Sequence, residues 1–158
     1  MKIQVQSQDF DISAEINDLC KGRTDIGAIV TFTGLVRDFH GDHNVRKMTL
    51  EHFPGMAEKQ LHEICQSAKG RWPLQGITVI HRHGTLDPGD QIVLVITLSA
   101  HREAAFEAAE FIMDWLKTDA PFWKKEQTEQ GAEWVAARIK DNKRKDRWTS
   151  TKPKGDKK

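Results

Sequence analysis

The sequence predicts an α+β fold, with helices and strands mixed along one chain of 158 residues. Some segments repeat apolar residues with the two-residue period of strands, and others with the three-to-four spacing of helices. These segments do not alternate regularly as strand and helix, so a doubly wound parallel sheet is disfavoured. The length fits a single domain with one core, which needs neither disulfides nor a structural metal to fold.

The first half of the chain is predicted to form three strands and two helices. The strands are expected at residues 2–6, 27–36 and 45–53, and the helices at 13–21 and 55–70. Gly22 and Gly70 end the two helices, because glycine adopts the left-handed conformation that closes a helix. Segment 37–44 contains several turn residues, so we expect an exposed, mobile loop there.

The second half is predicted to form a hairpin, a long helix and a short strand. Segments 76–83 and 91–98 are the hairpin strands, and 84–90 is their turn-rich connection. Over residues 100–118, alanines and larger apolar residues recur every three or four positions, which indicates a helix packed on the sheet. Pro121 ends that helix. Residues 122–126 then form a short strand.

The composition indicates a soluble, globular protein. Hydrophobic residues make up 38% of the chain and charged residues 30%. No segment reaches the roughly 20 apolar residues of a membrane span, and the start of the chain does not resemble a signal peptide, so we expect a cytoplasmic location. Cys20 and Cys65 lie far apart in the sequence and are expected to be free thiols.

The net charge of +1 is unevenly distributed, and the C-terminal end of the sequence is basic. Residues 138–158 contain ten Lys or Arg and three Asp, a net charge of +7, which leaves residues 1–137 at −6. Such an end can be a solubilising tail, a nucleic-acid arm or a flap over an anionic ligand. Trp134 and Trp148 predict that the part before Thr149 is partly docked. We therefore expect one domain over residues 1–140 and a basic, partly disordered tail over 141–158.

Several common catalytic motifs are absent from the sequence. It has no dinucleotide fingerprint, no P-loop and no nucleophile elbow. A segment that starts like a zinc-protease helix at His62 has Gln66 where the second histidine is needed. His81 and His83 lie on one side of a strand, but no third ligand is evident, so we expect no metal and no cofactor.

Cations around apolar residues remain as candidates for chemistry. His101 and Arg102 follow Ser99 at a strand-to-helix junction, where backbone N–H groups and the helix dipole favour an anion. Arg102 offers a planar fork for phosphate or carboxylate, and His101 can bind or move protons. The alternative is that Ser99 only caps the helix.

Lys117 and Lys124 lie on either side of the bend at Pro121. If the bend brings both ammonium groups into one partly apolar pocket, desolvation and repulsion favour a neutral lysine that acts as base or nucleophile. The alternative is that Lys117 complements its helix end while Lys124 and Lys125 form a solvated pair on an edge strand.

Two further arginines are candidates for ligand binding. Arg37 follows a buried strand and can point toward a ligand from the strand's end. Arg138, in the string WVAAR, can do the same from the start of the basic end. Each can instead be an ordinary surface charge.

Four strings resemble the large, catalytic subunit of molybdopterin synthase. They are TFTGLVRD from Thr31, TLEHFPGMAE from Thr49, VIHRHGTLDPGD from Val79, and SAHREAAFEAAEFIMDWLKTDAPFWKKE from Ser99. The resemblance covers about residues 26 to 140. It implies an α/β hammerhead-type fold with an additional small antiparallel β subdomain, in one catalytic domain.

The resemblance also implies an activity and partners. The family is a sulfurtransferase of molybdenum cofactor biosynthesis, converting cyclic pyranopterin monophosphate to the dithiolene of molybdopterin. The two sulfurs come from the C-terminal Gly-Gly thiocarboxylate of a small ubiquitin-like carrier subunit. The large subunits form a homodimer at the centre of a heterotetramer.

The resemblance assigns roles to six cations. Lys117 and Lys124 match the family's active-site lysines, and Arg37 matches the arginine of its TG-x-VR string. His101 and Arg102 match a phosphate-binding pair that the neighbouring large subunit contributes, and Arg138 matches another anion-binding arginine.

Two other functions remain open from the residues alone. One is a non-catalytic module that binds nucleic acid through the basic end and its tryptophans, with strongly salt-dependent affinity. The other is a metal-dependent hydrolase using His81 and His83. Deleting residues 141–158 is expected to abolish binding in the nucleic-acid case and to leave sulfur transfer largely intact in the synthase case.

Overall fold

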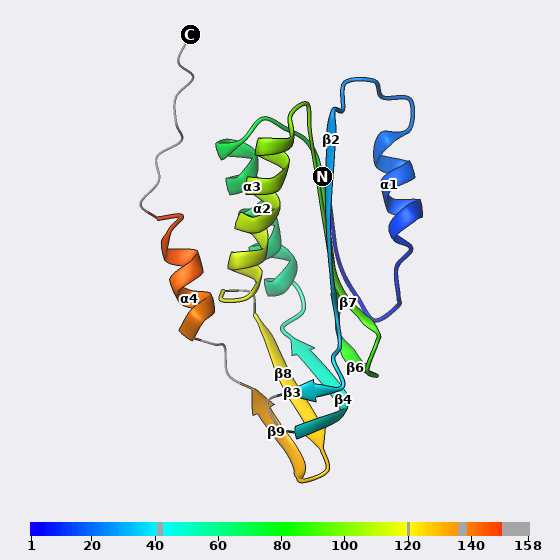
Figure 1. The fold of residues 1–158 in the computed structure, drawn as a ribbon, viewed down its shortest axis with the longest axis vertical. Helices are drawn as coiled ribbons and strands as arrows, with labels where there is room; N and C mark the ends of the chain where they lie inside the picture. Colours follow the sequence, from blue (N-terminus) through cyan, green and yellow to red (C-terminus); the bar gives the residue numbers. More distant parts are fainter. Residues whose placement is uncertain (41–42, 120, 136–138, 150–158) are drawn as a thin grey trace.

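The computed structural model describes residues 1–40, 43–119, 121–135 and 139–149. Figure 1 shows a main sheet with helices on both sides and a second group of strands at one end. The main sheet has the strand order β1-β5-β7-β2. Its strands are β1 (Lys2–Gln6), β2 (Ala28–Leu35), β5 (Leu74–Arg82) and β7 (Gln91–Ser99). β1 runs parallel to β5, and the other neighbours are antiparallel.

The predicted hairpin lies at the centre of the main sheet. β5 and β7 pair with Val79 opposite Val95, and both residues are fully buried. Helices cover both faces of these strands, which explains their nearly continuous apolar sequence. α1 (Ile12–Cys20) lies on one side, whereas α2 (Met56–Arg71) and α3 (Arg102–Leu116) lie on the other (Figure 1).

Two apolar clusters hold the helices to the sheet. The α2 and α3 side contains Leu61, Phe111 and Ile112 packed on β5 and β7. The α1 side contains Phe10, together with Ile80 of β5 and neighbouring residues of β7. Burying large apolar side chains on both faces is the main stabilising contribution of this layer.

A second, antiparallel sheet extends from one end of the main sheet. It contains β3 (Phe39–His40), β4 (His43–His52), β8 (Phe122–Thr128) and β9 (Gly131–Val135), with β6 (Gly84–Leu86) paired to β4. This mixture of helices with two sheets confirms the predicted α+β fold, including the additional antiparallel part.

Three short strands differ from the sequence-based expectation. β6 lies in the segment predicted as a turn, and β9 lies in a region left without structure. The exposed-loop prediction for 37–44 is wrong in part, because Phe39 and His40 pair with Asn44 and His43. Residues 41–42 lie outside the described part of the chain. Each short strand is held by its neighbour, a stabilisation that local patterns do not reveal.

The basic end begins with a helix that packs on α3. α4 (Ile139–Asp146) is followed by Trp148, whose ring lies edge-on to Trp72 and Phe111. The Trp148 indole donates a hydrogen bond of 2.8 Å to buried Asp114, as does Arg147. Trp148 thus confirms the expected docking. Trp134 does not, since it is 56% exposed.

The cysteines are free, as predicted. Cys65 is fully buried between α2 and the main sheet, and burial raises the pKa of its thiol to about 12. Across the described ranges, no helix combines the length and apolar character needed to cross a membrane.

Candidate active site

The register of the main sheet places several candidate residues at one of its ends. His81 of β5 lies opposite Val93 of β7, which in turn lies opposite Gly34 of β2. Arg37 follows β2 by two residues, so it is at the same end of the sheet as His81. Arg37 is exposed beyond buried Val36, consistent with a cation directed outward from the end of a strand.

Lys117 reaches this end from α3. It is the residue that closes the helix, and its backbone N–H donates to the Met113 carbonyl at 3.1 Å. Its charge lies close enough to His81 to contribute to the lowered pKa of that imidazole. The C-terminal end of α3 and the end of β5 therefore meet.

Lys124 lies on the inner side of β8. Strand alternation places Phe122, Lys124 and Glu126 on one face and Trp123 and Lys125 on the other. The Lys124 ammonium pairs with the carboxylate of Glu126, whose side chain is only 5% exposed. Because β8 pairs with both β4 and β9, it is not an edge strand, and the alternative of a solvated Lys124–Lys125 pair is wrong.

An aromatic stack lies beside both lysines. The imidazole of His81 stacks on the ring of Phe122 with centroids 3.7 Å apart and an interplanar angle of 16°. Its Nδ1 lies 2.8 Å from the backbone carbonyl oxygen of Arg82, which can only accept, so Nδ1 holds the proton. Burial lowers the pKa of His81 to about 4, with smaller contributions from Lys117, His52 and His83. The ring is therefore neutral near pH 7.

His101 and Arg102 lie at the other end of α3. Both are exposed, and His101 is the capping residue without a capping bond from its side chain. The Ser99 alternative is supported in part: its buried hydroxyl accepts from the backbone N–H of His101 at 3.3 Å, at the start of the helix, and donates to the Pro73 carbonyl at 3.0 Å. A 15-residue helix is about 22 Å long. One chain therefore does not bring His101 and Arg102 next to Lys117.

Two residues beside the lysines were not predicted from the sequence, and one predicted residue is outside the described part of the chain. Arg138 lies outside the described residues. Sequence reasoning did not predict Glu126 as the counter-ion of Lys124, although their two-residue spacing on a strand was available as a signal. It also did not predict the Phe122 stack, because nothing in the sequence shows that β8 starts against His81.

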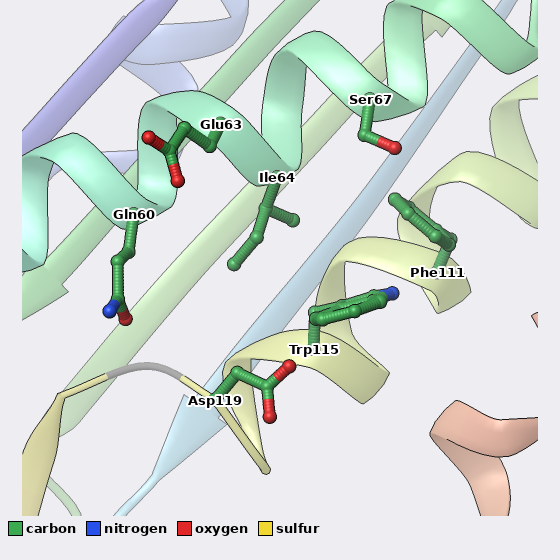
Figure 2. A pocket seen from close by; sticks show the side chains of 7 residues that line it. All are labelled: Gln60, Glu63, Ile64, Ser67, Phe111, Trp115 and Asp119. Atoms are coloured by element: carbon green, nitrogen blue, oxygen red, sulfur yellow. The ribbon is translucent and has the colours of Figure 1, made fainter. Parts of the chain in front are cut away.

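A separate pocket of about 550 Å³ lies between α2 and α3 (Figure 2). Its walls include the apolar side chains of Ile64, Phe111 and Trp115 and the carboxylates of Glu63 and Asp119. None of the predicted cations lines it, and its carboxylates disfavour an anionic substrate. We therefore place the candidate active site at the lysines and not in this pocket.

The described residues contain no group of three or more His, Cys, Asp or Glu side chains arranged to hold a metal ion. His83 lies against His52, with ring centroids 4.5 Å apart, whereas His81 faces Phe122. The hydrolase alternative therefore receives no support from the arrangement of these two histidines.

The family model for the MoaE protein matches residues 5–119. This chain belongs to the MoaE family. A MoaE-family relative, the molybdopterin synthase catalytic subunit of Mesorhizobium japonicum, is 54% identical over 151 residues, 94% of each chain. The catalytic subunit of Escherichia coli is 53% identical, with 93% of this chain and 97% of the relative covered. The predicted family resemblance is confirmed.

Solved structures agree with the MoaE assignment. The molybdopterin biosynthesis MoaE protein from Burkholderia ambifaria is 47% identical, with a TM-score of 0.79 and coverage of 95% of this chain and 99% of that chain. A protein-protein complex of subunits 1 and 2 of the molybdopterin-converting factor from Helicobacter pylori contains the same fold at 18% identity, with a TM-score of 0.71 over 86% of this chain and 91% of that chain.

Proposed function

We propose that Lys117 and Lys124 are the catalytic residues of a sulfur transfer from a carrier thiocarboxylate to cyclic pyranopterin monophosphate. The chain is the catalytic subunit of a molybdopterin synthase, a sulfur-transferring enzyme of molybdenum cofactor biosynthesis, as its curated relatives indicate. The observation that supports the residue assignment is the meeting of Lys117 and the inner face of β8 beside the His81–Phe122 stack. A cytoplasmic location stays a prediction.

In this proposal the partner of this chain is a small subunit. The Helicobacter pylori complex with the same fold contains two subunits of a molybdopterin-converting factor. In our proposal the carrier's C-terminal tail ends at the two lysines, which hold its anionic end. The lysines stabilise the oxyanion that forms as the acyl–sulfur bond breaks. Arg37 binds substrate phosphate, and a nearby lysine or histidine transfers protons as sulfur replaces oxygen.

The missing phosphate-binding pair comes from a second copy in this proposal. β2 is an edge strand of the described sheet, with Ile29, Phe32 and Leu35 exposed. Antiparallel pairing of two β2 strands about a two-fold axis places the Ala28 end of one beside the Leu35 end of the other. Because Ala28 pairs with Ser99, the partner copy's α3 start then approaches Arg37. Two sulfurs per product require two carrier molecules.

Substitution of the lysines tests the catalytic assignment. Lys117→Ala and Lys124→Ala are expected to lower product formation from preformed thiocarboxylated carrier by about 100-fold or more, as for loss of an oxyanion-stabilising group. Lys125→Ala is the matched control, because Lys125 lies on the other face of the same strand over the ring of Trp134. Undiminished product with Lys117→Ala would remove Lys117 from the chemistry.

A further inference from the structure

We propose that His81 is a positioning residue. By stacking on Phe122, it fixes that ring against the main sheet and so sets the positions of Lys117 and Lys124 relative to each other. The inference rests on the proposed function. His81 acts through the stack, which joins β5 of the main sheet to the first residue of β8 in the second sheet.

The His81 side of the stack is rigid. His81 is 8% exposed and lies on a central strand, opposite Val93 of β7. The hydrogen bond from Nδ1 to the Arg82 carbonyl fixes the orientation of the ring. A side chain with its plane set by a backbone bond and its strand paired on both sides is suited to support another ring.

The two lysines lie on either side of Phe122 in the sequence, so their relative positions depend on where Phe122 is held. Lys117 closes α3 five residues before Phe122, and Lys124 follows Phe122 by two residues on the same face of β8. The segment between the lysines thus changes from the helix layer to the second sheet. The stack is an aromatic contact at that change, and His52 lies further from Phe122, with ring centroids 6.0 Å apart.

The neutral state of His81 suits this role. Lys117, His52 and His83 are the charged or titratable groups near its ring, and each disfavours a second positive charge there. A neutral imidazole can pack against Phe122 and beside an ammonium group without repelling it. His81 can therefore hold Phe122 in place without repelling the lysine ammonium groups of the site.

Loss of the support is expected to affect turnover more than binding. A displacement of about 1 Å between reacting groups can cost about 100-fold in rate. In the proposed function the lysines hold only the end of the carrier's tail, so a small displacement is expected to change the carrier's affinity less than the rate. We expect His81→Ala to lower kcat by about tenfold or more with the carrier Kd within about threefold of wild type. His81→Phe keeps a flat ring against Phe122 and is expected to restore kcat to within about threefold.

The experiment compares the kcat of wild type, His81→Ala, His81→Phe and Phe122→Ala in steady-state reactions with thiocarboxylated carrier and cyclic pyranopterin monophosphate. Circular dichroism and carrier affinity verify that each variant is folded. His62→Ala is the control, since His62 is exposed on α2 and bonds only to Gln66 among the described contacts. If His81→Ala does not fold, Phe122→Ala removes the same contact from its more exposed side.

The outcomes separate the two proposals. Wild type that forms no product overturns the proposed function and this inference with it. Active wild type with loss of kcat in His81→Ala and recovery in His81→Phe supports the positioning role. A folded His81→Ala with wild-type kcat overturns the inference alone. Equal loss in His81→Ala and His81→Phe also overturns it, because an imidazole nitrogen would then be required in place of the stack.

Discussion

Neighbouring lysines on β8 show how one position along a strand changes the chemistry of a side chain. Lys124 points inward and pairs with buried Glu126. Lys125 points outward, with its ammonium 5.5 Å from the centroid of the Trp134 ring. The string FWKKE allowed a strand to be predicted, but only the burial of Glu126 and the contact of Phe122 with His81 show which lysine faces the core. The environment of each lysine therefore could not be derived from residue type alone.

His81 is expected to make stability depend on pH. Its pKa is about 4 when folded and near 6.5 when unfolded, so acid favours the unfolded chain. The stability linked to its neutral form is complete above pH 6.5 and is lost as the pH falls toward 4, by about 3 kcal/mol in total. Urea unfolding at pH 7.5 and 4.5 measures this loss. His81→Phe should lose on the order of 2 kcal/mol less than wild type, and identical losses would contradict the assignment.

Among the elements, those with strong internal patterns were predictable. β5, β7 and α3 have long apolar or helical repeats, because each packs directly on the core. β3, β6 and β9 have two, three and five residues, and pairing with β4 or β8 stabilises them. α4 was also not predicted, since its sequence contains mostly charged residues. Its position depends on contacts with α3 that only the folded chain provides.

The docking of the segment after α4 can be measured by removing one ring. Trp148→Ala deletes the contacts with Trp72 and Phe111 and one hydrogen bond to Asp114, so we expect a loss of about 2–4 kcal/mol. Trp134→Ala removes an exposed ring and is expected to cost less than about 1 kcal/mol. Chemical denaturation gives both values. Similar small losses would mean that this segment does not stabilise the fold.

At the scale of the whole molecule, the candidate site is distributed over opposite ends of one chain. Arg37, Lys117 and Lys124 could be proposed from their residue types and from the family resemblance. The separation of His101 and Arg102 from Lys117 also follows from the predicted helix over residues 100–118, since they lie at its opposite ends. The contact of Phe122 with His81 could not be predicted, because it depends on how the second sheet meets the main sheet. Two described cations of the basic end pair with the fold: Lys145 with Asp119, and Arg147 with Glu110 and Asp114. Lys143 and Arg144 are exposed, so the nucleic-acid alternative stays open for them.

Mixed dimers test whether two copies share each site. A His101→Ala/Arg102→Ala chain and a Lys117→Ala chain are each expected to be nearly inactive alone. After exchange, random pairing gives half mixed dimers with one intact site each, so about a quarter of wild-type activity should return. Native mass spectrometry verifies the exchange. No recovery in confirmed mixed dimers would show that each site is built from one chain.

The burial of Cys65 has a consequence for an enzyme that handles activated sulfur. A thiol must lose its proton to attack a sulfur donor, and this one remains protonated throughout the physiological range. It also has no exposed surface through which a donor could approach. Cys65 is therefore unavailable as a nucleophile toward the carbonyl carbon of a thiocarboxylate, and its side chain only fills the core between α2 and the main sheet.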